Sequence, residues 1–161
     1  MTTISSGSIV NLYRWTSGTP NPTAEARSAL RRALDQTGLS AETIGDSVLA
    51  TSELVANASE HAVGPYELRL RRTAAEFICE VLDHDPRLPE APNPPSASPP
   101  EPGPHDCGGN LHASCALLPE QGRGLHIVHS LTSGRWGMHK LGDGAKVTWI
   151  ALPLPHDGHR T

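Results

Sequence analysis

The chain has 161 residues and a formal net charge of -4, which is enough for one domain with a buried core and too little for two ordinary ones. Lysine and arginine are scattered along it without a basic stripe, so a nucleic acid is not an expected partner. The N-terminus lacks the features of an export signal and no apolar run approaches the length of a membrane span, so we expect a cytoplasmic protein without a membrane contact.

Three cysteines, Cys79, Cys107 and Cys115, are an odd number and do not indicate a disulfide framework. Cys79 lies in an apolar alternating run and is expected to be a small buried residue. The other two share a segment with His105 and His112, enough ligands in number for zinc. Their spacing differs from that of zinc ligands, so we do not expect a metal there.

The N-terminal half of the chain predicts one strand followed by two helices. The strand spans Ile9 to Trp15. A first helix begins with Thr23 as its N-cap, and Gly38 stops it. A second helix begins after Ser40 and runs to about His61, where a Gly-Pro pair breaks it.

Two strands follow, YELRLRR over residues 66–72 and EFICEVLD over residues 76–83, and they are expected to form an antiparallel pair. Eight of the 15 prolines then fall between residues 89 and 104, so residues 86–121 are expected to be a loop. A helix carries Leu125, Val128 and Leu131 on one side. A final hairpin joins RWGMHKL to AKVTWIAL.

This order of elements predicts an α+β fold, a two-layer sandwich in which a mixed, mainly antiparallel sheet is covered on one face by helices. We expect a single domain over residues 1–155 and a polar tail over residues 156–161.

The second helix carries an unusual polar pair. Its apolar and small residues gather on one side, whereas Glu53 and Asn57 lie together nearly opposite. Such a pair can be a solvated helix face. A carboxylate and an amide oxygen one turn apart can also hold Mg²⁺ or its waters, and the carboxylate could accept a proton from a hydroxyl.

Two further motifs could bind parts of a nucleotide. Asp83 ends an apolar strand, where it could accept the exocyclic amine of adenine, or could be an ordinary turn residue before Pro86. Gly122-Arg123-Gly124-Leu125 opens the helix after the long loop. Glycines there let backbone N–H groups approach an anion, and a helix N-terminus favours negative charge.

In this order, ELVANA, VLDHDP and GRGLHIV resemble the N, G1 and G2 boxes of the GHKL (Bergerat-fold) ATPases. The small stand-alone bacterial members similar to anti-sigma-factor serine/threonine kinases are the nearest likeness. The resemblance implies ATP and Mg²⁺ as cofactors, with Asn57 as the metal ligand, Glu53 as the general base and Asp83 as the adenine reader. Residues 122–125 would contact the phosphates. They would also mark one end of an ATP lid over about residues 86–121.

The resemblance also implies partners: a sigma factor, an anti-anti-sigma antagonist whose serine is phosphorylated, and a second copy in a homodimer. One departure stands out, because many members have D-x-G-x-G at the second box and this chain has Asp83-His84-Asp85-Pro86-Arg87 without a glycine. Two hypotheses therefore stand side by side. The first is the kinase, and the alternative is a non-catalytic regulatory module that binds partners with weak or lost ATP binding.

Overall fold

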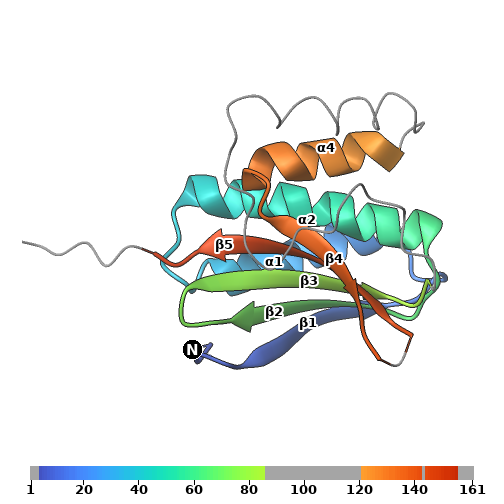
Figure 1. The fold of residues 1–161 in the computed structure, drawn as a ribbon, viewed down its shortest axis with the longest axis horizontal. Helices are drawn as coiled ribbons and strands as arrows, with labels where there is room; N and C mark the ends of the chain where they lie inside the picture. The colour runs from blue at the N-terminus through green and yellow to red at the C-terminus, as the bar shows by residue number, and fades with distance from the viewer. Residues whose placement is uncertain (1–3, 86–120, 143, 156–161) are drawn as a thin grey trace, which may run out of the picture.

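The computed structural model describes residues 4–85, 121–142 and 144–155. Within these ranges the order of elements is β1 (Ile9–Trp15), α1 (Pro22–Leu34), α2 (Ala41–His61), β2 (Tyr66–Arg72), β3 (Glu76–Asp83), α4 (Gln121–Thr132), β4 (Trp136–Lys140) and β5 (Lys146–Pro153) (Figure 1). No helix in these parts of the chain is long and apolar enough to cross a membrane.

The strands form one sheet in the order β1-β2-β3-β5-β4, and each neighbouring pair is antiparallel. The helices lie together on one side of this sheet (Figure 1). The predicted two-layer α+β sandwich is therefore confirmed. The predicted lid over 86–121, apart from Gln121 at the start of α4, lies outside the described residues, as do Cys107, Cys115 and the tail over 156–161.

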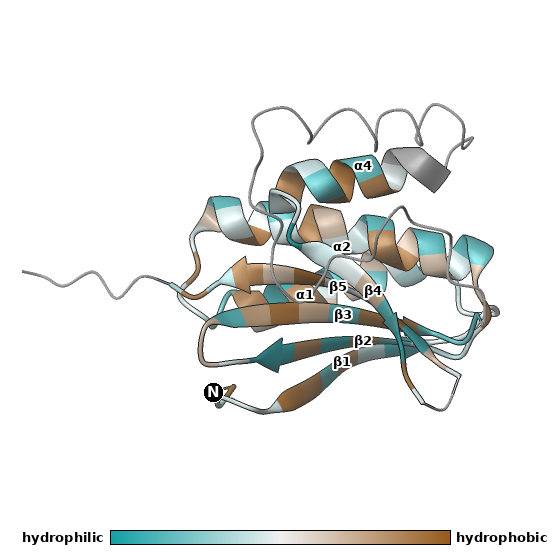
Figure 2. Ribbon diagram, viewed as in Figure 1, coloured by the Kyte–Doolittle hydropathy of each residue, from teal (hydrophilic) through white to brown (hydrophobic). Residues whose placement is uncertain are grey.

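The core forms between the sheet and the helices. In β2 the alternating Tyr66, Leu68 and Leu70 are buried, because successive side chains of a strand point to opposite faces. Figure 2 shows apolar residues along much of β3 in the middle of the sheet. Cys79 is fully buried there, as predicted, and burial raises the pKa of its thiol to about 12.

The helix starts follow local rules, although one of them was predicted wrongly. Ser40 caps α2, since its hydroxyl accepts the N–H of Thr43 at 3.1 Å. Helix α1, in contrast, starts at Pro22 after Asn21 and not after a capping Thr23. Proline suits the first helical position because its missing N–H would have had no partner there. Gly38, at φ +80°, lies in the turn after this helix ends.

Helix α2 is packed on more than one side, against the sheet, α1 and α4. Its buried residues consequently cover a wide arc: Ile44, Ser47, Val48, Ala50, Thr51, Ser52, Leu54, Val55 and Ala58. Helix α4 contributes Val128, which is fully buried, while Leu125 and Leu131 pack against the core. The predicted apolar side of α4 is therefore confirmed.

The C-terminal end of α4 is held by His129, which is partly buried. Its Nδ1 accepts the indole N–H of Trp136 at 3.3 Å, and its carbonyl accepts the N–H of Gly134 at 2.9 Å. Burial lowers the pKa of His129, and the charge of His126 lowers it further. The imidazole is thus held neutral, as an acceptor for Trp136 must be.

Protonation of His129 should destabilise the fold. Because its folded pKa lies below its unfolded value of about 6.5, its contribution is present above that pH and is lost as the pH falls through the folded pKa. We expect the free energy of unfolding, measured by urea titration followed by circular dichroism, to fall less between about pH 7.5 and about pH 5.5 in His129→Gln than in the wild type. An identical pH dependence in the two proteins would contradict this.

Candidate functional site

The polar pair of α2 lies against the first turn of α4. A Cβ added to Gly124 would lie 3.1 Å from Oε2 of Glu53, and 3.4 and 3.5 Å from Nδ2 and Oδ1 of Asn57. Both polar side chains are half-buried. The structure therefore brings the first and third motifs into contact, and the simpler interpretation of a fully solvated helix face is wrong.

Glycine at position 124 is what permits this close approach. Any side chain there would crowd the Glu53 carboxylate, whereas glycine leaves the two polar groups facing backbone. Gly124 belongs to the first turn of α4, where backbone N–H groups lack intrahelical partners and attract an anion. Gly122 and Arg123 lie in the same turn, and their side-chain placement is outside what the structure describes. Leu125 packs inward against the core.

Asp83 is a buried carboxylate at the end of β3, with 2% of its surface exposed. Its Oδ1 accepts the N–H of Asp85 at 2.9 Å, and its Oδ2 lies 3.4 Å from Nζ of Lys146. Burial raises the pKa of the Asp83 carboxyl above its ordinary value, while the Asp85 N–H and the Lys146 ammonium oppose this rise. The site thus holds an acceptor in surroundings with little water.

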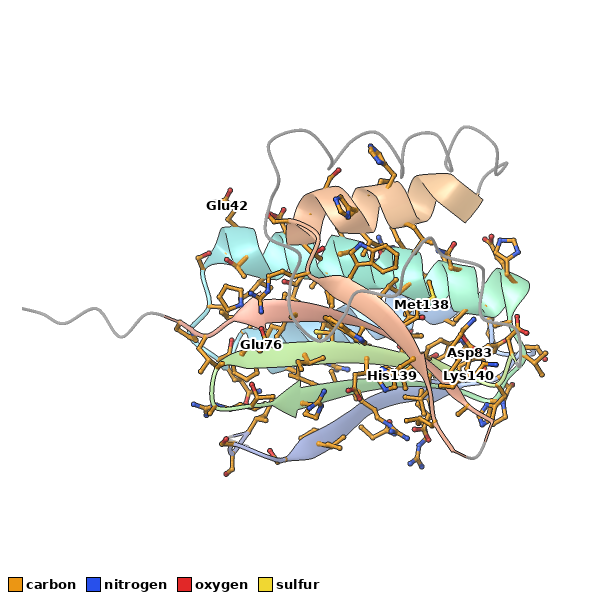
Figure 3. The ribbon with its side chains drawn as sticks, viewed as in Figure 1. Glu42, Glu76, Asp83, Met138, His139 and Lys140 are labelled. Atoms are coloured by element: carbon orange, nitrogen blue, oxygen red, sulfur yellow. The ribbon has the colours of Figure 1, made fainter. Side chains whose placement is uncertain are left out.

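Lys146 is a residue that the sequence analysis missed. It lies directly opposite Asp83 in the β3–β5 ladder, and its side chain is only 10% exposed. Lys140 on β4 is opposite Lys146 in turn, and it is exposed. Figure 3 shows Asp83 and Lys140 at the same end of the sheet. Lys146 is placed opposite Asp83 by the strand register, which cannot be read from the sequence alone.

The end of β3 is tied to the end of α2. His84 donates its backbone N–H to the carbonyl of Val63 and its ring Nδ1–H to the carbonyl of Pro65, both at 2.8 Å. The Tyr66 hydroxyl donates to the carbonyl of Ala62 at 2.9 Å. Figure 1 shows the C-terminal ends of α2 and β3 and the N-terminal end of α4 on the same side of the molecule. All three motifs therefore lie at one end of the fold.

The family model for the histidine kinase-like ATPase domain matches residues 16–147. The chain belongs to this family, which places it among the GHKL-like ATPases and gives it an ATP-binding domain. The match covers all three motifs and strand β3 with Asp83, and it ends one residue after Lys146, at the start of β5. A comparison with curated proteins gave no match.

The Asp83–Lys146 pair should be strongly coupled in stability. Asp83→Asn would retain the acceptor for the Asp85 N–H but leave a nearly buried ammonium without its counter-ion, a cost of about 3 kcal/mol. Lys146→Met would strand the carboxylate in the same way. The double variant removes both charges, so we expect it to recover most of this loss in urea unfolding.

Lys140→Met is the matched control, because it removes an exposed lysine beside the pair and should change the free energy of unfolding by less than about 0.5 kcal/mol. Additive losses in the double variant would show that the two side chains do not interact in solution.

Proposed function

We propose that the protein is an ATP-dependent protein serine/threonine kinase of the anti-sigma-factor type, which phosphorylates a serine on an anti-anti-sigma antagonist. The observation that carries this proposal is the contact of Gly124 with Glu53 and Asn57. It joins the carboxylate and amide of one helix to the anion-favouring first turn of another. Asp83 lies at the same end of the fold and supplies a buried hydrogen-bond acceptor for the adenine base.

The side chains present fit Mg²⁺ and ATP. Asn57 would hold Mg²⁺, a cation that prefers oxygen ligands and keeps several waters. When bound, Mg²⁺ neutralises charge on the phosphates. The backbone N–H groups of residues 122–124 would face the phosphates, and Asp83 would accept the 6-amino group of adenine.

Glu53 would act as the general base. Its carboxylate takes the proton of the serine hydroxyl while the serine oxygen forms a bond to the γ-phosphorus and the bond to the leaving ADP oxygen breaks. A half-buried carboxylate suits this role, because it is accessible to an incoming hydroxyl and partly shielded from water. Asn57 lies one turn further along α2. It would fix the position of the phosphates relative to the general base, Glu53.

The regulatory role follows from the same likeness. The protein would hold a sigma factor in one state and its antagonist in the other, as a homodimer, and phosphorylation of the antagonist would decide between them. Leu49 on α2 and Ile127 on α4 are exposed apolar side chains of the helical layer, and they offer contact surface for such a partner. ATP binding by the domain is the step that this switching needs.

Separate variants test the two roles on α2. We expect Glu53→Gln to lower phosphotransfer to an antagonist-type serine protein by about a hundredfold or more, with ATP affinity retained. Asn57→Ala should remove the Mg²⁺ dependence of ATP binding in calorimetry. Glu60→Gln is the control, because its side chain is 68% exposed on the same helix and should leave both properties unchanged.

Partner capture that survives in Glu53→Gln and Asn57→Ala, together with no phosphotransfer by the wild type, would support the non-catalytic binding module. That outcome would contradict the kinase.

Gly124 should affect phosphotransfer more than it affects the stability of the fold. Gly124→Ala would place a methyl group 3.1 Å from the Glu53 carboxylate, and alanine favours a helix over glycine by about 1 kcal/mol. We expect stability within about 1 kcal/mol of the wild type and phosphotransfer reduced about tenfold by the displaced base.

Gly45→Ala provides the matched control, since a Cβ there would meet no heavy atom within 4 Å. Equal transfer rates in Gly124→Ala, Gly45→Ala and the wild type would remove Gly124 from the site.

A further inference from the structure

Lys146 is placed to contact whatever Asp83 contacts. The two residues are opposite each other in adjacent strands, with side chains only 4% exposed for Asp83 and 10% for Lys146. Both belong to the face of the sheet that carries Cys79 and Ile150, the face that packs against the helices. A ligand that reaches the Asp83 carboxylate therefore also reaches the Lys146 ammonium.

The contacts between the two side chains do not use all of their hydrogen-bonding atoms. Asp83 uses Oδ1 for its own loop, by accepting the Asp85 N–H, and presents Oδ2 to Lys146 at 3.4 Å. This N–O separation is longer than a good charge-assisted hydrogen bond. The ammonium has three donors, and Asp83 takes at most one of them.

Stability alone is a weak explanation for the buried Asp83–Lys146 ion pair. Removing two charges from water costs several kcal/mol per ion, and buried ion pairs often repay this no better than apolar residues would. Strands β3 and β5 already pair along their whole length, and apolar side chains such as Val81 and Ile150 are buried on them. A function in recognition gives these two charges a reason to be there.

The Asp83–Lys146 pair is complementary to the hydrogen-bonding edge of adenine. Adenine presents a donor, its 6-amino group, next to an acceptor, its ring N1. We propose that Lys146 is a base-specificity residue, whose ammonium donates to N1 of adenine while Asp83 accepts from the 6-amino group. This inference rests on the nucleotide site proposed above and extends it from one base contact to two.

The two contacts together predict selectivity. Guanine and hypoxanthine present an acceptor at position 6 and an N–H donor at N1, the reverse of adenine. An acceptor would then face the Asp83 carboxylate, and a donor would face the Lys146 ammonium. Unpaired or opposed buried polar groups discriminate strongly between ligands. Asp83 alone would discriminate less, because a carboxylate can accept from either the 6-amino group of adenine or the N1–H of guanine.

The test is calorimetry of the full chain with Mg²⁺ and each of four nucleotides: ATP, 1-deaza-ATP, 7-deaza-ATP and GTP. In 1-deaza-ATP a C–H replaces N1, so the wild type should bind it about tenfold or more weakly than ATP, the value of a hydrogen bond to a charged group. Since 7-deaza-ATP keeps N1, it should bind like ATP, and GTP should bind much more weakly.

Variants assign the effect to Lys146. In Lys146→Met, ATP and 1-deaza-ATP should bind with the same affinity, whereas Lys140→Met, which removes the exposed neighbour, should keep the wild-type difference. Lys146→Arg keeps the positive charge beside Asp83. It is the variant to measure if Lys146→Met does not fold. It should retain a preference for ATP over 1-deaza-ATP.

The outcomes separate this inference from the proposed function. Equal wild-type affinity for ATP and 1-deaza-ATP, tighter binding of ATP by Lys146→Met, or a wild-type preference for GTP would overturn the role of Lys146 and leave a nucleotide site in place. No binding of any of the four nucleotides by the wild type would overturn the proposed function and this inference together.

Discussion

Helix α2 is packed between the sheet and helix α4, and this double packing places the candidate site. A helix that buries two sides has only a narrow stripe left for polar residues. In α2 that stripe carries Glu53 and Asn57, which α4 covers with a glycine. The position of the polar pair is therefore fixed by the core packing of α2 on both sides of it.

The same architecture explains how distant motifs form one site. The segments that follow α2 and β3 are tied together by the backbone and ring of His84. The first turn of α4 then lies on the C-terminal half of α2, so the backbone N–H groups of that turn lie beside the α2 polar pair. A helix N-terminus that favours an anion, two oxygen-bearing side chains and a buried carboxylate are components from which a nucleotide site can be built. The chain belongs to the family of histidine kinase-like ATPase domains, and the proposed nucleotide site is placed at this end of the fold.

Much of the fold could be predicted from the sequence because its signals are local. Alternating apolar residues indicated β2 and a more continuous apolar run indicated β3, while the Ser40 cap and the Gly-Pro break indicated the ends of α2. The start of α1 was predicted wrongly, although Pro22 at the first helical position was a usable signal. The spacing of Glu53 and Asn57 was visible, but what covers them depends on tertiary packing. Lys146 could not be found, because its partner is set by strand register and its charge looked ordinary at the start of a hairpin strand.

Amide chemical shifts test most directly whether Glu53, Asn57, Asp83 and Gly124 form one nucleotide site. We would record ¹H–¹⁵N spectra of the full chain with Mg²⁺ and increasing amounts of a non-hydrolysable ATP analogue. The largest changes should fall on the Gly124 and Asp85 backbone amides and on the Asn57 side-chain amide. A saturated complex in which these three signals do not move would contradict the site, and so would the absence of any binding.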